Sequence, residues 1–228
     1  MKELTPLQRQ VLELFIRSPL KEHFYWSGGT ALAVVYLHHR YSQDLDFFSD
    51  TAFSREELSP FLQQLQSSLQ LDSIEEKKIF DRREFFLHNG GTVRLEFVHY
   101  DHPILASRKK WKNLKVDSLD DLATNKIMAL VDRNEPKDAL DVYFLLTKEK
   151  YPVEKLLEFV KKKFGVSLKE DTVWSEALKS AKELGTLKPF IIAKTEKEQA
   201  EIIEKTTAYF EQQAKKFLHR AIESSPRR

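Results

Sequence analysis

Residues 27–49 read SGGTALAVVYLHHRYSQDLDFFS, and the fold of the N-terminal half follows from this stretch. The residues just before it, 23–26, are short and aromatic and lead into a glycine pair, so they predict a buried strand that ends in a tight turn. Residues 30–38 have helical character, and residues 45–49 predict a second strand. The chain is therefore expected to run strand, glycine turn, helix, strand.

Two aspartates open the second of these strands. Asp44 and Asp46 are two residues apart, so both carboxylates project to the same face of the strand. Two such carboxylates repel each other unless a positive charge lies between them, and a divalent cation is the natural neutraliser. Oxygen-only ligands suit Mg²⁺ or Mn²⁺ bound together with substrate phosphates. The alternative is a solvated acidic motif at a strand start, because Asp-x-Asp is a common sequence.

The glycine turn favours the metal site. Gly28, Gly29 and Thr30 are separated from Asp44 by thirteen residues, 31–43, which is enough for one helix that returns the chain to an adjacent strand. The glycines would then lie beside the carboxylates. Glycine lets the backbone approach a polyphosphate closely, and the amides at the start of a helix donate hydrogen bonds to it. Together the two motifs predict a metal and nucleotide site.

A predicted hairpin at 84–100 offers a third carboxylate. Its turn is an Asn-Gly-Gly sequence, and Glu96 lies between two apolar residues of its second strand, so Glu96 faces away from the core together with Arg94. Glu96 joins the two aspartates if this hairpin pairs beside their strand. The alternative is a cross-strand ion pair between Glu96 and Arg94 or another base.

The remaining pattern predicts an α+β fold with two domains. Further helices are expected at 5–18 and 54–69, and a further strand at 74–80. From residue 116 onward only helices are expected, near 118–131, 134–146, 152–164, 171–184 and 195–222. We therefore expect a mixed β-sheet domain with flanking helices at 1–115 and an all-helical domain at 116–228. The basic stretch 108–115 is interpreted as a solvated linker, with contact to an RNA acceptor as the alternative.

The helical half contains a second group of charges. Lys126 and Arg133 are seven residues apart, so both project from one helix face and could hold triphosphate oxygens or the leaving pyrophosphate. Asp138 and Asp141 share one side of the next helix. The alternative is a set of surface ion pairs, such as one between Lys137 and Asp141. Nearer the aspartates, the Ser42 hydroxyl is a candidate contact for phosphate or ribose.

These motifs resemble the DNA polymerase β-like nucleotidyltransferase superfamily, and in detail they are similar to its abortive-infection AbiEii/AbiGii toxin branch. The first matching run is Gly28-Gly29-Thr30-Ala31-Leu32-Ala33, followed by His39-Arg40-x-Ser42-x-Asp44-Leu45-Asp46-Phe47-Phe48. The second is Lys126-Ile127-Met128-Ala129-Leu130-Val131-Asp132-Arg133, followed by Lys137-Asp138-Ala139-Leu140-Asp141-Val142-Tyr143. One position departs from the superfamily, whose third acid is usually aspartate rather than the glutamate found at 96.

The resemblance implies a nucleotidyltransferase-type sheet domain and transfer of a nucleoside monophosphate from an NTP, with release of pyrophosphate. It implies Mg²⁺ or Mn²⁺ at Asp44, Asp46 and Glu96, with Asp138 as a further catalytic group that orients or deprotonates the acceptor. The implied nucleotide contacts are Gly28, Gly29, Thr30, Ser42, Lys126 and Arg133. The implied biological role is the toxin of a bacterial toxin–antitoxin or phage-defence system, with tRNA as the acceptor and a cognate antitoxin as partner.

Composition narrows the remaining classes. The 228 residues carry a formal net charge of +2, which is too balanced for non-specific coating of nucleic acid, and the absence of cysteine excludes disulfides and a cysteine nucleophile. No apolar run is long enough for a membrane span, so we expect a cytoplasmic protein with no membrane contact. Two alternatives to the RNA-modifying enzyme stay open: a small-molecule nucleotidyltransferase of the antibiotic-modifying kind, and a non-catalytic nucleotide-binding module.

Overall fold

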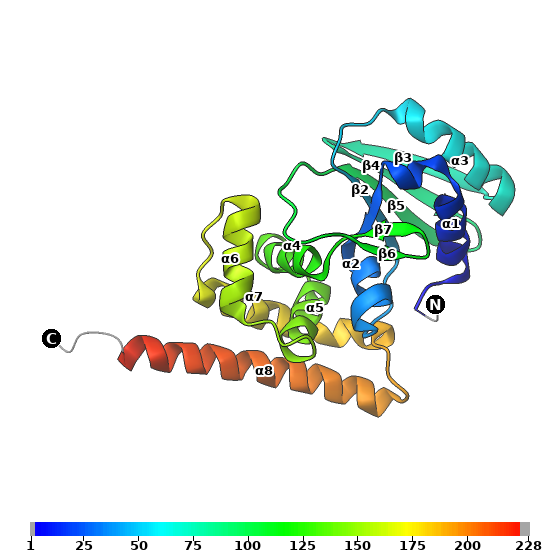
Figure 1. Ribbon diagram of the computed structural model, residues 1–228. Coiled ribbons are helices and arrows are strands. Elements are labelled where there is room, and N and C mark those ends of the chain that lie inside the picture. The colour runs from blue at the N-terminus through cyan, green and yellow to red at the C-terminus, as the bar shows by residue number, and fades with distance from the viewer. Residues whose placement is uncertain (1–2, 224–228) are drawn as a thin grey trace. The chain divides into compact units, whose positions relative to one another are not determined.

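The computed structural model describes residues 3–223 and divides the chain into two compact units, Met1–Leu122 and Ala123–Arg228 (Figure 1). The first unit contains a seven-stranded sheet with helices against it, and the second consists of helices, as the α+β prediction states. The sheet of the first unit includes the chain up to Val116, the last residue of its strand β7 (Leu114–Val116). Within residues 3–223, no helix is both long enough and apolar enough to cross a membrane.

The sheet of the first unit is mixed, with the strand order β3-β4-β5-β2-β1-β7-β6. The strands are β1 (Tyr25–Ser27), β2 (Asp44–Ser49), β3 (Ser73–Ile79), β4 (Arg82–His88), β5 (Thr92–His99), β6 (Lys109–Trp111) and β7 (Leu114–Val116). β2 pairs with β5 in parallel and with β1 in antiparallel fashion. The predicted hairpin at 84–100 is confirmed as β4 and β5, and it does pair beside the strand of the two aspartates.

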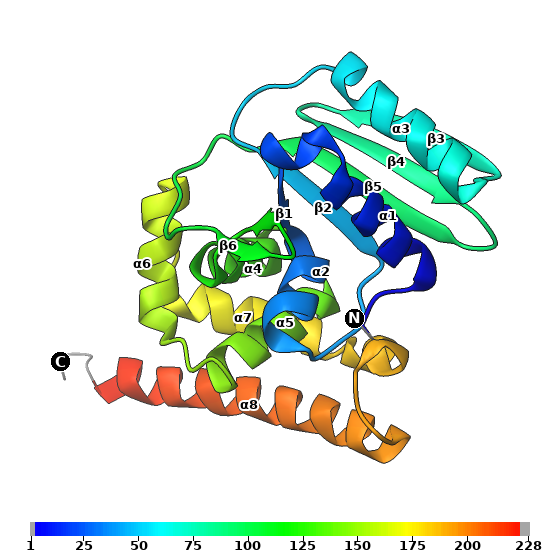
Figure 2. The same cartoon turned by 45° about the vertical axis from the view of Figure 1, so that its right-hand side comes forward.

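One face of this sheet is the hydrophobic core. Helices α1 (Pro6–Arg17) and α3 (Arg55–Leu69) lie against it (Figure 2), and each starts with a capping box, formed by Thr5 with Gln8 and by Ser54 with Glu57. Phe47 and Phe97 project from neighbouring strands into the core, where the Phe15 ring stacks on Phe47 at a centroid distance of 3.7 Å. Because side chains alternate along a strand, the residues between these apolar ones face the other side.

The glycine turn leads directly into a helix, as expected. α2 (Gly28–Ala31) begins at the first glycine, two residues earlier than predicted, and continues into the π-helical segment η2 (Leu32–Leu37), which ends at His38 in the left-handed conformation. A short 3₁₀ segment, η1 (Pro19–Glu22), precedes β1. The order strand, glycine turn, helix, strand is therefore confirmed.

The basic stretch 108–115 is a hairpin rather than a linker, so that interpretation was wrong. β6 and β7 are three residues each and are joined by Lys112 and Asn113, whose φ values of 47° and 65° are both left-handed. Two left-handed residues form the type of turn that matches the twist of a two-residue hairpin. Trp111 anchors the hairpin, with its ring centroid 5.2 Å from that of Trp26.

The second unit contains the five predicted helices and one additional 3₁₀ segment. They are α4 (Leu119–Asp132, which starts in the first unit), α5 (Pro136–Thr147), α6 (Val153–Phe164), α7 (Glu170–Ala181), η3 (Leu184–Phe190) and α8 (Glu196–Glu223). Phe210 of α8 is fully buried and lies near the rings of Trp174 on α7 and Tyr143 on α5. Aromatic packing among α5, α7 and α8 thus forms the core of this unit.

Candidate active site

Strand register brings three predicted carboxylates to one face of the sheet. Asp46 lies opposite Ser27 of β1 on one side and opposite Glu96 of β5 on the other, while Asp44 lies opposite Arg94. Asp46 and Glu96 are buried, at 8% and 5% exposure, whereas the Asp44 side chain is 26% exposed. The two aspartates and Glu96 are therefore neighbours on adjacent strands, on the face opposite the phenylalanine core.

A guanidinium group lies between these carboxylates. Arg94 donates a hydrogen bond from Nη2 to Asp44 Oδ2 at 2.8 Å, and its Nη1 is 3.1 Å from Glu96 Oε1. The ion pair that the sequence left open as an alternative is therefore present, and it includes Asp44 as well as Glu96. Arg94 neutralises part of the negative charge that two close carboxylates would otherwise accumulate.

The buried acidic cluster extends one strand further than the sequence analysis suggested. Glu84 of β4 lies directly opposite Glu96 and is also buried, and Arg82 Nη1 is 3.8 Å from both glutamates. Burial raises the pKa of Glu96 to about 7; the negative charge of Asp46 acts in the same direction, and Arg94 and Arg82 oppose it. The alternation of β4 could have identified Glu84, since it lies two residues from Arg82 on the same face.

We expect replacement of Glu96 with glutamine to change how stability depends on pH. In the folded protein the pKa of Glu96 is about 7, above the ordinary value of 4.5. Protonation of Glu96 therefore contributes stability that is fully present below pH 4.5 and is lost as pH rises through 7. Relative to that of Glu96→Gln, the free energy of unfolding of the original protein should therefore decrease as pH rises from 4.5 to 7 in metal-free buffer. Urea unfolding at several pH values measures this, and parallel pH curves for the two proteins would contradict it.

Gly28 places the start of α2 directly against Asp46. Its φ is +75°, and a Cβ built on it would lie 1.8 Å from Asp46 Oδ2, so both the backbone conformation and the space require glycine. Two residues further on, the Thr30 hydroxyl donates to the backbone carbonyl of Asp44. The glycine turn and the aspartates are thus adjacent, as the spacing predicts.

Gly28→Ala should lower the activity of this site by roughly a hundredfold, because displacing Asp46 misplaces the groups that the site holds. Left-handed backbone strain adds about 1–2 kcal/mol of destabilisation. Gly90→Ala is the matched control, since Gly90 has a φ of +60° and an added Cβ would meet no atom of the described residues within 4 Å. Steady-state activity assays and thermal unfolding of both variants separate the two effects. Equal activity of the two variants would remove Gly28 from the site.

Ser42 lies in the connection before β2. Its backbone carbonyl accepts a 2.8 Å hydrogen bond from Gln8 Nε2 of α1, which fixes the chain just ahead of Asp44. Contact between the Ser42 hydroxyl and a nucleotide stays a prediction.

The charged residues predicted on the helices form a network around two buried aspartates within the second unit. Lys126 Nζ donates to Asp138 Oδ1 at 2.8 Å and is 2.7 Å from Asp141 Oδ2, while Arg133 Nε donates to Asp138 Oδ2 at 2.7 Å. Both aspartates are fully buried. Lys137, whose spacing makes it a possible partner of Asp141, instead pairs with Glu135 at 2.7 Å. Burial alone would raise the pKa of Asp138, but Lys126 and Arg133 outweigh it and lower that pKa.

The carboxylates of β2 and β5 have the donor chemistry of a site for a hard divalent cation. All of the donors are oxygens, and the buried Glu96 Oε1 accepts no hydrogen bond from any group in residues 3–223. In the arrangement described, Arg94 already bridges Asp44 and Glu96. Among residues 3–223, no three acidic or histidine side chains are positioned to hold a metal ion without rearrangement. A cation at this site would therefore replace ion pairs of Arg94.

Solved structures show the same fold. The crystal structure of JHP933 from Helicobacter pylori is similar with a TM-score of 0.56 and 20% identity, over 95% of this chain and 94% of that one. The crystal structure of a putative nucleotidyltransferase from H. pylori is similar with a TM-score of 0.55 and 20% identity, over 94% of this chain and 99% of that one.

Sequence comparison extends over most of the chain. The protein aq_aa25 from Aquifex aeolicus (strain VF5), described as uncharacterized, is 29% identical over 167 residues, which is 72% of this chain and 77% of that protein. The family model "Nucleotidyl transferase AbiEii toxin, Type IV TA system" matches residues 10–224. The resemblance inferred from the sequence motifs is thereby confirmed, and the chain belongs to the AbiEii nucleotidyl transferase toxin family of type IV toxin–antitoxin systems.

Proposed function

We propose that the chain transfers a nucleoside monophosphate from an NTP to an RNA acceptor such as tRNA, with release of pyrophosphate. The observation that carries this proposal is the alignment of Asp44, Asp46 and Glu96 on adjacent strands beside the backbone of Gly28. This places acidic oxygens next to a glycine turn at a helix start, which is the combination that a metal-bound triphosphate requires.

Within this proposal the chain's own groups have separate tasks. The carboxylates of Asp44, Asp46 and Glu96 would hold Mg²⁺ or Mn²⁺, which when bound neutralises phosphate charge and stabilises the leaving pyrophosphate. The backbone amides at Gly28 and Gly29 would bind phosphate oxygens. Thr30 holds the helix start against β2 through its bond to the Asp44 carbonyl. Most of the catalytic effect would come from positioning and electrostatics.

The helical network would contribute in a different way. A lowered pKa makes Asp138 a weak base near neutral pH. We therefore propose that Asp138 positions Lys126 and Arg133 rather than deprotonating the acceptor. These two cations remain candidates for offsetting the charge of the nucleotide.

The family supplies the biological setting. Membership of a toxin–antitoxin family implies a cognate antitoxin as a protein partner. We propose that the toxin acts in the cytoplasm, where NTPs and tRNA occur together.

The experiment that tests the function is label transfer. Purified protein is incubated with Mg²⁺, total tRNA and each α-labelled NTP in turn. Label on RNA that depends on Asp44 and Asp46 would support the proposal and identify the nucleotide. Label on a protein or small molecule would replace the RNA acceptor, and NTP binding without pyrophosphate release would indicate a non-catalytic module.

A further inference from the structure

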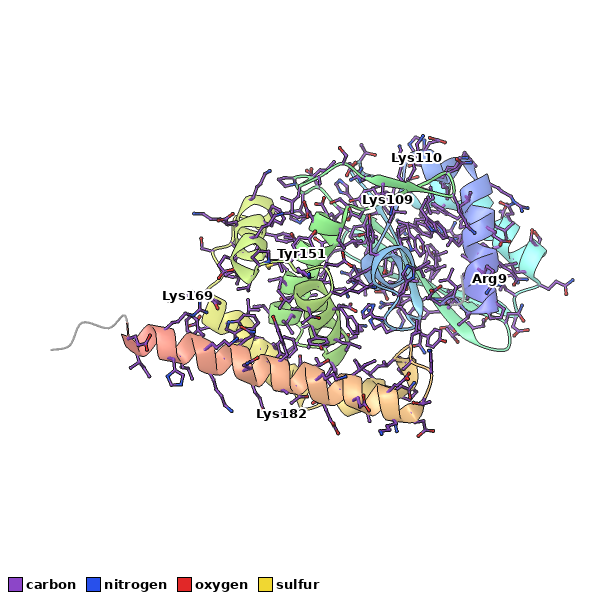
Figure 3. All side chains as sticks on the ribbon, turned by 60° about the horizontal axis from the view of Figure 1, so that its bottom comes forward. Arg9, Lys109, Lys110, Tyr151, Lys169 and Lys182 are labelled. Carbon is purple, nitrogen blue, oxygen red and sulfur yellow. The ribbon has the colours of Figure 1, made fainter. Side chains whose placement is uncertain are left out.

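The β6–β7 hairpin carries an unusual local charge. Residues 108–116 include one arginine and four lysines and no acidic residue, although the whole chain is nearly neutral. Lys109 and Lys110 can be followed on this hairpin in Figure 3. A uniformly basic segment within a balanced chain points to a local anionic partner.

Two of these lysines face each other directly. Lys110 of β6 pairs with Lys115 of β7, so both side chains project from the same face of the hairpin, and both are exposed. Within residues 3–223 neither lysine forms an ion pair; Lys115 Nζ only donates to the neutral carbonyl of Glu22 at 3.2 Å. Like charges directly opposite each other in a sheet are destabilising. A bound anion would remove this repulsion.

The lysine pair lines a pocket. Lys110, Lys115 and Arg108 form it together with the loop 104–107, and its volume is about 640 Å³. Asp121 fixes the loop by accepting hydrogen bonds from the backbone amides at 105 and 106, at 3.2 and 3.3 Å. Arg108 is held by Asp50 and by the Tyr25 ring, whose centroid is 3.4 Å away. We call this the hairpin pocket.

The hairpin pocket opens on the same face of the sheet as the acidic cluster. β7 runs parallel to β1 with Trp26 opposite Val116, so Lys115 shares the face of Tyr25 and Ser27. Ser27 in turn lies opposite Asp46. Lys115 lies two strands away from Asp46 across the sheet and two residues away along the strands. With neighbouring strands about 4.8 Å apart, this separates their Cα atoms by about 12 Å.

We propose that the hairpin pocket binds the phosphodiester backbone of the RNA acceptor, a short distance from the end that reacts. The inference rests on the proposed function and adds a docking surface to it. Charge complementarity favours a polyanion as the occupant. Because the hairpin pocket lies on the same face as the acidic cluster, one RNA strand can reach both of them. The triphosphate of the NTP shares this phosphate chemistry and is the occupant that the test must distinguish.

The test is RNA binding in an inactive background. Fluorescence anisotropy follows a labelled, unstructured RNA oligonucleotide on Asp44→Asn/Asp46→Asn protein, with and without Lys110→Ala/Lys115→Ala, between 50 and 200 mM salt. We expect the lysine double variant to bind roughly tenfold more weakly and the slope of log K against log salt to fall by about 1.4, since each phosphate contact contributes about 0.7. Lys161→Ala/Lys162→Ala, two exposed lysines of α6, is the matched control and should change neither quantity.

The remaining readouts separate the docking site from the function. Equal RNA binding by the lysine variant and its parent would overturn the docking site. Loss of NTP binding by calorimetry on Lys110→Ala/Lys115→Ala would also overturn it, by assigning the pocket to the triphosphate. If label were transferred to a non-RNA acceptor and the protein bound no RNA, the docking site would be overturned, although the protein would still be a transferase. Lysine-dependent RNA binding in a protein that transfers no label would support the docking site and refute the proposed function.

Discussion

Asp44→Asn/Asp46→Asn is expected to reduce label transfer from α-labelled NTP to RNA by about a thousandfold or more. Both carboxylates lie on the face that Gly28 approaches, and amides of the same shape can neither hold a divalent cation firmly nor balance its charge. The shape of the side chains is retained, so the strand pairing of β2 with β1 and β5 should persist. Initial rates under saturating Mg²⁺ and NTP measure the effect.

The control for this pair is Asp72→Asn, an equally conservative change at an exposed position before β3. It should leave transfer unchanged. Thermal unfolding of the Asp44→Asn/Asp46→Asn protein should show a cooperative transition near that of the original, because the Asp44 ion pair with Arg94 is partly exposed and worth little. A double variant that keeps more than a tenth of the activity would remove these two residues from the catalytic site.

Part of this site could be predicted because its signals are local. The glycine pair, the helical segment and the Asp-x-Asp strand follow one another within residues 27–49, and their spacing is enough to predict that Gly28 and the aspartates meet. Predicting the position of Glu96 required one further fact, namely that β5 pairs with β2. Nothing in either strand specifies that pairing, since it depends on the order of the whole sheet.

Other features escaped prediction because they arise from tertiary structure or from very short elements. β6 and β7 have three residues each and are rich in lysine, so their pattern matches an exposed linker as well as a strand. The bridging role of Arg94 depends on the parallel register that puts Asp44 opposite it. The lysine that neutralises Asp141 comes from α4 rather than from the nearby position 137, because helix packing rather than sequence spacing selects the partner.

Lys126→Met should destabilise the second unit by about 3–5 kcal/mol. Its ammonium group lies between the fully buried carboxylates of Asp138 and Asp141, at 2.8 and 2.7 Å. Methionine keeps much of the apolar stem but removes the charge, which leaves Asp141 without this cation and Asp138 with Arg133 alone. Removing an ion-pair partner from a buried carboxylate is costly, so urea unfolding should show a lower midpoint.

The matched control is Lys137→Met, because Lys137 pairs with the partly exposed Glu135 and should contribute less than about 1 kcal/mol. Adding Asp141→Asn to Lys126→Met should recover part of the loss, because the side chain that has lost the ion pair with Lys126 is then uncharged. Because the pKa of Asp138 is lowered in the folded protein, its ionised carboxylate contributes stability above the pKa of the unfolded chain. This stability is lost as pH falls through the pKa of the folded protein. The difference in free energy of unfolding between the original protein and Lys126→Met should therefore become smaller at acidic pH. A Lys126→Met protein as stable as Lys137→Met at neutral pH would show that the network does not stabilise the unit, and would leave phosphate binding as the reason for Lys126.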